Sequence, residues 1–157
     1  MQSEKQGPAA TANGPRTENL IHTLRKKIEA LSAKRQAEVC NKCTDLQAAD
    51  GEITTMGVSY RLLRDLAHAG EFSAFTTKSF CVEFIKPMTL PFRCSFVNLF
   101  RAVMPPSVTE VEVRKATSFV SHAWEYSVQE QLFGPLLSKT SSGTEVLWLD
   151  ILSVNQH

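Results

Sequence analysis

Apolar residues change their spacing along this chain of 157 residues. Between residues 16 and 106 they recur at intervals of three and four, which is the period of an amphipathic helix. After residue 106 they gather into short runs, of which the clearest are residues 117–120 and 146–151. Short apolar runs between turn signals are typical of strands that are buried on both faces. The pattern therefore predicts a helical amino-terminal region followed by a small α/β unit.

The first fifty residues divide into a tail and a long helical segment. Residues 1–15 have few large apolar side chains and several glycines and prolines, so we expect them to be disordered. Residues 16–50 form an amphipathic helix with a single apolar stripe. The stripe consists of Leu20, Leu24, Ile28 and Leu31. It either packs on its own chain or joins a partner helix as a candidate coiled coil.

Residues 51–106 form a helical lead-in to the α/β unit. A turn-rich segment at residues 51–57 opens it, since two glycines enclose the polar stretch between them. Apolar spacing predicts one helix over residues 60–70, ending at a glycine, and another over residues 95–104, ending at two prolines.

A further helix of the lead-in begins at Thr76 or Thr77, whose hydroxyl groups can accept a hydrogen bond from a free N–H of the first helical turn. We expect this helix to end before Pro87, because proline clashes with the preceding turn. Residues 86–91 are then predicted to be an extended connector.

The carboxyl-terminal residues 107–157 alternate between predicted strands and helix. Residues 107–116 alternate apolar and charged side chains, which favours a strand; the alternative is a short linker into the strand that follows. A strand at 117–120, a helix at 127–138 and a strand at 145–151 follow, and such a unit has parallel strands. A sheet with only these strands leaves an apolar edge unpaired. Either the chain is a fragment, or a partner supplies the missing strands.

Composition argues against several classes of function, among them nucleic-acid binding and membrane insertion. The net charge is +1, so no overall charge attracts the chain to nucleic acid or to a membrane. No apolar segment resembles a signal peptide, and none approaches the roughly 20 residues of a membrane span. We therefore expect an intracellular, cytoplasmic protein with reduced cysteines, whose partners are proteins rather than nucleic acids or membranes.

The four cysteines do not have the spacing of a metal site. Cys40 and Cys43 form a CxxC sequence on one helix face, but structural zinc requires four ligands. Cys81 and Cys94 have no neighbouring Cys or His at ligand spacing, and we expect them to be small buried hydrophobic residues. No metal site is predicted; zinc or redox chemistry at the CxxC is the alternative to incidental helix cysteines.

Polar and aromatic residues follow both apolar runs of the α/β unit. In open α/β sheets, ligands bind beyond the carboxyl ends of the strands. His122 and Asp150 either bind a ribose or a metal there or form bonds that cap loops. Trp124 and Trp148 either stack on a base or belong to the core. The candidate residues for a ligand crevice are Ser121, His122, Trp124, Asp150, Asn155 and Gln156.

These motifs resemble a known family. The sequence FVSHAW at residues 119–124, followed by WLDILSVNQH at residues 148–157, resembles the TIR-like domain of many protist and algal proteins. It is also similar to the opening of fungal heterokaryon-incompatibility domains. The upstream Thr76, Cys81 and Pro87 fit the helical lead-in of the protist group, so the resemblance covers residues 74–157.

The resemblance implies a flavodoxin-like fold, of which residues 107–157 would be the first βαβ unit. Some TIR-like domains are signalling scaffolds that self-associate, and others cleave NAD with a glutamate in a Trp-Cys-x-x-Glu motif. Neither Trp124 nor Trp148 is followed by cysteine, so no residue here can take that role. We therefore expect a TIR-like signalling or scaffold module without catalytic activity and without a cofactor. The alternatives are an NAD-cleaving hydrolase domain whose glutamate lies beyond this chain, and a helical adaptor with a structural βαβ end.

Overall fold

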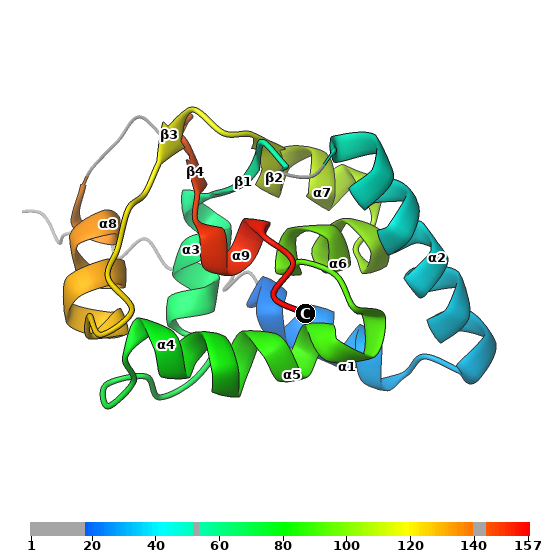
Figure 1. Ribbon diagram of the computed structural model, residues 1–157, viewed down its shortest axis with the longest axis horizontal. Helices are drawn as coiled ribbons and strands as arrows, with labels where there is room; N and C mark the ends of the chain where they lie inside the picture. Colours follow the sequence, from blue (N-terminus) through cyan, green and yellow to red (C-terminus); the bar gives the residue numbers. More distant parts are fainter. Residues whose placement is uncertain (1–17, 52–53, 140–143) are drawn as a thin grey trace, which may run out of the picture.

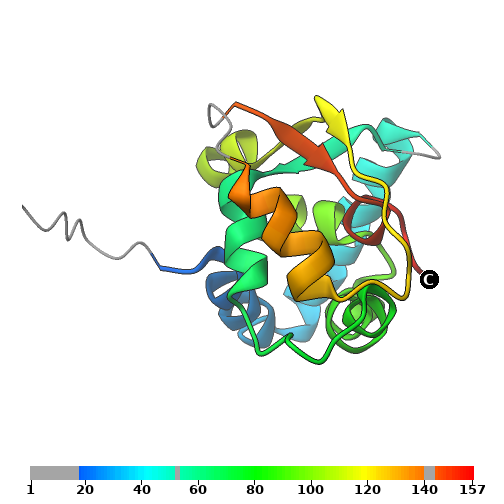
Figure 2. The same cartoon turned by 90° about the vertical axis from the view of Figure 1, so that its left-hand side faces the viewer.

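The computed structural model describes residues 18–51, 54–139 and 144–157. The predicted disorder of residues 1–15 lies outside these ranges. Figures 1 and 2 show the strands along one side of the molecule, with most of the helices packed on the opposite side. The protein is therefore a mixed α/β protein in which helix predominates.

The strands form one mixed sheet in the order β2–β1–β4–β3. Strand β1 (Met56–Ser59) pairs antiparallel with both β2 (Val113–Lys115) and β4 (Val146–Trp148). Strand β3 (Ser118–Phe119) pairs parallel with β4, as the strand–helix–strand pattern predicted. The expected two-stranded sheet is wrong, because β1 covers the other side of β4. The sequence analysis had assigned this strand to a turn.

Gly57 explains why β1 was missed. A Cβ atom at this position would lie 2.5 Å from the carbonyl oxygen of Leu147 and 3.1 Å from Cβ of Ala116. The glycine therefore permits a close approach between β1 and β4 rather than a turn. Nothing near Gly57 in the sequence indicates this role, because Leu147 lies ninety positions further along the chain.

The strand predicted over residues 107–116 is wrong for most of its length. Helix α7 (Pro106–Glu112) occupies the segment, and β2 begins only at Val113. Pro106 is the first residue of the helix, a position that proline favours because its missing N–H is not needed there. Glu112 is buried and bonds to Ser59 and Arg61, so its charge is compensated.

The helix that begins after the Thr76 cap does not end at Pro87, and the predicted extended connector is wrong. Lys86 N–H bonds to the carbonyl of Cys81, five residues back, in one wide turn of π-helix. This extra residue lies directly before the proline, where a regular turn would clash with its ring. The continuous helical segment consists of α4 (Thr77–Phe80), η1 (Cys81–Ile85), α5 (Lys86–Thr89) and η2 (Leu90–Phe92).

The crossover helix between β3 and β4 has the same construction. It begins with a π-helical stretch, η3 (Val128–Phe133), and continues as α8 (Gly134–Ser138). Gly134 N–H bonds to the carbonyl of Gln129, again five residues back and directly before a proline, Pro135. The helix predicted over residues 127–138 is confirmed, and Ser127 caps its start.

The amino-terminal helical segment divides into α1 (Leu20–Glu29) and α2 (Ala33–Asp50). Leu20 and Leu24 are buried in the main core, whereas Ile28 and Leu31 are only partly buried. All four residues of the predicted stripe therefore pack on their own chain, and Ile28 and Leu31 also keep part of their surface exposed.

The main core lies between the sheet and the helices below it. Helices α3 (Tyr60–Ala67) and α6 (Phe96–Val103) occur where the apolar spacing predicted them. The aromatic rings of Phe72, Phe80 and Phe84 pack against one another with centroids 4.9–5.2 Å apart. A smaller cluster lies beneath α2 and contains Val39, Cys43, Phe92, Cys94 and Leu99.

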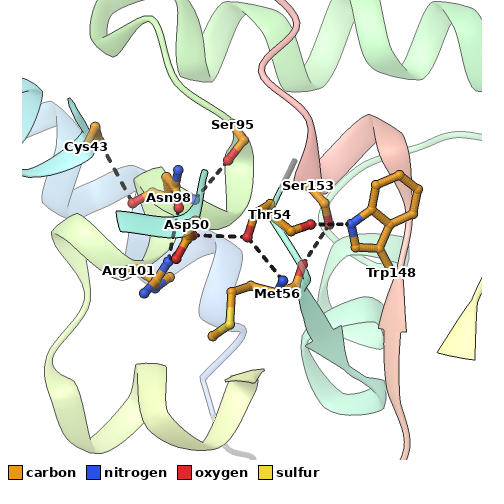
Figure 3. Close-up of polar contacts among 9 residues, drawn as sticks. All are labelled: Cys43, Asp50, Thr54, Met56, Ser95, Asn98, Arg101, Trp148 and Ser153. Atoms are coloured by element: carbon orange, nitrogen blue, oxygen red, sulfur yellow. Dashed lines mark hydrogen bonds and ion pairs between the residues drawn. The ribbon is translucent and has the colours of Figure 1, made fainter. Parts of the chain in front are cut away.

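A polar network connects the end of α2 with the sheet (Figure 3). Asp50 forms an ion pair with Arg101 at 2.7 Å and accepts a hydrogen bond from the Thr54 hydroxyl. The indole N–H of Trp148 donates to the Thr54 carbonyl at 2.8 Å, and the hydroxyl of Ser153 donates to the backbone carbonyl of β1. Of the two roles predicted for Trp148, base stacking or a structural role, these contacts favour the structural role.

Candidate functional site at the strand ends

His122 and Asp150 meet at the carboxyl ends of the two parallel strands. His122 follows β3, and Asp150 follows β4 as the first residue of helix α9 (Asp150–Ser153). His122 Nε2 lies 2.6 Å from Asp150 Oδ1. The imidazole side chain is 3% exposed, whereas the carboxylate is 40% exposed. The two residues predicted to share this edge of the sheet are therefore in direct contact.

Asp150 also organises the backbone around it. Its Oδ1 accepts a hydrogen bond from the Ile151 N–H at 2.7 Å, at the start of α9. Its carbonyl accepts a bond from the Gln156 side chain at 3.0 Å. These are the capping bonds expected of a structural carboxylate, so the pair stabilises the ends of both strands whether or not a ligand binds.

One nitrogen of the His122 imidazole, Nδ1, is available for a further hydrogen bond. Because the Asp150 carboxylate accepts, Nε2 of His122 donates, and Nδ1 of a neutral ring is left as a hydrogen-bond acceptor. Nδ1 is buried and has no partner within the described part of the chain. A buried acceptor of this kind is a site for a water molecule or for a donor group of a ligand.

The loop after β3 is attached to the first turn of α4. The carbonyl of Trp124 accepts a bond from the Lys78 N–H at 2.9 Å, and the carbonyl of Tyr126 accepts one from the Thr77 N–H at 2.8 Å. These bonds satisfy N–H groups that a helix start leaves free. The ring of Trp124 packs edge-on against the His122 ring, with centroids 5.5 Å apart.

A crevice of about 440 Å³ lies between this loop, helix α4 and the segment that follows α4. Its lining residues are Lys78, Cys81, Val82, Lys86, Trp124, Glu125 and Gln156. Two ammonium groups outnumber the single carboxylate of Glu125, and together with a half-exposed indole they suit a ligand that combines negative charge with a flat ring. Burial raises the pKa of the Cys81 thiol, which keeps it protonated and makes it a poor nucleophile.

The structure brings together some of the predicted crevice residues and separates others. Trp124 and Gln156 line the crevice, beside the contact of His122 with Asp150. Ser121 is exposed and does not line it. Asn155 points away, because its amide donates to the carbonyl of Arg93 at 2.9 Å.

A second feature is the edge of the sheet at β3. Among the residues that the structure describes, this strand has a neighbour on one side only. Phe119 is 71% exposed, and its ring contacts Trp148 with centroids 5.3 Å apart on the outer face of the sheet. Figure 2 shows this strand at the outer end of the sheet, with the helices on the opposite side. The prediction that residues 117–120 are buried on both faces is therefore wrong.

The comparisons found no match. Neither the protein-family models nor the curated proteins nor the solved structures contain a match to this chain. The resemblance to TIR-like domains therefore stays a prediction, and the function has to be argued from geometry. Across residues 18–51, 54–139 and 144–157, no helix has the length and apolar character needed to cross a membrane. In the same ranges, no three His, Cys, Asp or Glu residues are grouped so as to hold a metal ion.

The sequence analysis missed the two lysines of the crevice. Lys86 lies in the segment that was predicted to be an extended connector, and no role was predicted for Lys78. Their proximity to Trp124 depends on the loop after β3 returning to α4, which no local pattern encodes. The pairing of Thr76 with Ser127, fifty-one positions apart, secures that return. Free N–H donors occur at every helix start, so they are too general a signal to have identified this contact.

Proposed function

We propose that this chain is a TIR-like signalling or scaffold module that acts by self-association through β3. One observation carries the proposal, namely the large exposed ring of Phe119 on a strand that forms the edge of the sheet. Edge strands pair readily with strands of another molecule, and soluble proteins usually protect them with charge, proline or a covering element. Neither residue of β3 is charged or a proline.

The expected partner is a second copy of the chain. Two β3 edges related by a twofold axis would pair antiparallel, and each Phe119 ring would become buried at the interface between the two copies. Burying a phenylalanine ring contributes about 1.5–3 kcal/mol, so two rings contribute about 3–6 kcal/mol. This gain is comparable only with the lower end of the cost of association, about 4–15 kcal/mol, so the backbone pairing of the two edges must contribute as well. The association is therefore expected to be weak and to depend on local concentration, as suits a scaffold.

A flavodoxin-like sheet is the finer part of the proposal. In such a fold β3 would lie inside the sheet, and a further strand would pair on its free side. The antiparallel strand β1 beside β4 departs from an all-parallel sheet. The proposal therefore places the flavodoxin-like part at β3, β4 and the crossover helix, with β1 and β2 added at the other side.

Sedimentation velocity over a range of concentrations tests the association. The chain is expected to sediment faster as its concentration rises, and Phe119→Asp is expected to remove this dependence. Leu90→Asp is the matched control, because Leu90 is also a large exposed apolar residue but lies on η2, away from the sheet. A wild-type chain that stays monomeric up to its solubility limit would overturn the proposal.

A second candidate function is nucleotide processing at the strand ends, with NAD as the ligand. The observation that favours it is the crevice itself, where Lys78, Lys86 and Trp124 lie beside the His122–Asp150 contact. The lysines suit a diphosphate, and the indole suits a nicotinamide or adenine ring. Isothermal titration with NAD measures binding, and release of nicotinamide measures cleavage.

Lysine variants distinguish NAD binding in the crevice from unspecific binding elsewhere on the protein. Lys86→Gln is expected to weaken NAD binding, while Lys27→Gln, outside the crevice, is expected to leave it unchanged. Nicotinamide release that disappears in Asp150→Ala would make the enzyme the preferred function. Absence of NAD binding at millimolar concentration would exclude this candidate without touching the association through β3.

A further inference from the structure

Two cysteines far apart in the sequence lie in contact beneath α2. Cys43 is on α2, and Cys94 lies between η2 and α6, fifty-one positions later. Their sulfur atoms are 3.2 Å apart, and both residues are only 1% exposed. The chain has four cysteines and all of them are free, so this pair is present as two thiols.

The contact makes the two sulfur atoms chemically different. The Cys94 thiol donates a hydrogen bond to the Cys43 sulfur, and this bond lowers the pKa of Cys43. The same bond, together with burial, raises the pKa of Cys94. A thiol with stabilised thiolate character beside a protonated one is the arrangement in which the first reacts with an oxidant and the second resolves the product.

Backbone geometry holds Cys94 in place. The preceding residue, Arg93, has a φ of 49°, in the left-handed region that residues other than glycine seldom adopt. Its carbonyl accepts a hydrogen bond from Asn155, which supports this conformation from the end of the chain. A left-handed conformation costs free energy in a residue other than glycine, so it persists only where surrounding contacts stabilise it.

An oxidant can reach the pair through movement of α2. This helix has eighteen residues, but only Val39 and Cys43 are buried. A helix with so little buried apolar surface opens locally at a small free-energy cost. One turn before Cys43 lies Cys40, which is partly exposed and whose sulfur is 3.6 Å from the Pro91 carbonyl. The cluster therefore has a partly exposed thiol beside the buried pair.

We propose that Cys43 and Cys94 form a reversible disulfide when the protein meets hydrogen peroxide. The Cys43 thiolate attacks peroxide, the O–O bond breaks, and Cys43 becomes a sulfenic acid while hydroxide leaves and takes up a proton as water. Cys94 then loses its proton and attacks the sulfenic sulfur, which releases a second water molecule. In sum, two thiols and one peroxide give one disulfide and two waters. A dithiol such as dithiothreitol reverses the reaction by exchange.

The geometry needs little rearrangement. A disulfide has a bond length of about 2.05 Å, so the sulfur atoms must approach by about 1.2 Å from their present contact. The bond would link α2 covalently to the segment that leads into α6. It would thereby restrict the local opening of α2, a helix in which only Val39 and Cys43 are buried.

Peptide mapping without reductant tests the proposal. After brief treatment of the full chain with peroxide, the expected result is a peptide pair joined through Cys43 and Cys94, with Cys40 and Cys81 still free to alkylation. Dithiothreitol should restore all four thiols. A chain that keeps four free thiols, or a main product linked through Cys40 and Cys43, would overturn the proposal.

Matched variants identify the roles of the two sulfurs. Cys94→Ser is expected to abolish the disulfide and to leave a sulfenic acid at Cys43 that dimedone traps. Cys81→Ser is the control, because Cys81 is buried elsewhere in the core and is expected to leave the disulfide unchanged. If Cys94→Ser does not fold, the wild-type peptide map decides alone, since it names the linked residues directly.

Discussion

Replacing Gly57 by alanine tests the close approach of β1 and β4, on which the whole sheet depends. The added Cβ would lie 2.5 Å from the Leu147 carbonyl oxygen, whereas carbon–oxygen contacts between strands lie at about 3.3–3.6 Å. The strands must therefore separate by about 0.8 Å or more. A hydrogen bond of about 2.9 Å would then exceed 3.5 Å and be lost.

The expected cost follows from the pairing that is lost. The β1–β4 ladder joins Val58 with Leu147 and Ser59 with Val146, all of them buried. At about 1–2 kcal/mol for each buried hydrogen bond that is broken, two bonds cost about 2–4 kcal/mol. For a protein of this size, that corresponds to a fall in melting temperature of about 5–15 °C.

Urea unfolding followed by tryptophan fluorescence measures the change, because Trp148 lies on β4 itself. Gly134→Ala is the matched control. Its Cβ would meet only the Gln129 carbonyl at 3.0 Å, and alanine is favoured over glycine within a helix by about 1 kcal/mol. If Gly57→Ala unfolds within about 0.5 kcal/mol of the wild type, the tight pairing of β1 with β4 is wrong.

Three further predictions concern stability. Trp148→Phe removes the indole bond to a backbone carbonyl and should cost about 1–3 kcal/mol of unfolding free energy, measured by urea titration; no change would mean that water replaces the bond. Arg101→Met leaves the 14% exposed Asp50 carboxylate without its ion pair and should cost about 2–4 kcal/mol, whereas Arg35→Met, at an exposed pair, should cost less than about 1 kcal/mol. Burial and neighbouring cationic side chains lower the pKa of His157, so the unfolded chain binds more protons below the ordinary histidine pKa. Stability should therefore fall as the pH drops through that pKa toward the lower folded value, and His157→Gln should make the melting temperature less dependent on pH in this window; an unchanged slope contradicts the assignment.

Local patterns predicted those elements whose signals lie within one turn or one strand. The apolar spacing and the cap candidate Thr76 predicted the helices of the lead-in. The apolar runs found the parallel pair β3 and β4. These predictions succeeded because the spacing of apolar residues within a short segment is enough to indicate a helical face or a buried strand.

The errors occurred where a distant residue decides the local structure. Gly57 reads as a turn unless Leu147 is known to lie against it. Pro87 reads as the end of a helix unless the wide turn before it is known. The exposure of Phe119 depends on which strands are present beside β3, and no spacing within the strand itself contains that information.

The candidate site divides in the same way. The contact of His122 with Asp150 was predictable, because the carboxyl ends of adjacent parallel strands lie together. The lysines of the crevice and the contact of Cys43 with Cys94 were not predictable. Both depend on contacts between segments that lie about fifty positions apart in the sequence. Only the tertiary fold brings these groups together.

The π-helical turns before Pro87 and Pro135 have a consequence for comparing sequences. Each turn holds one residue more than a regular helix, and one residue rotates every later side chain by about 100° about the helix axis. A related protein with regular helices would therefore lack one residue at each place and align with a gap inside a helix.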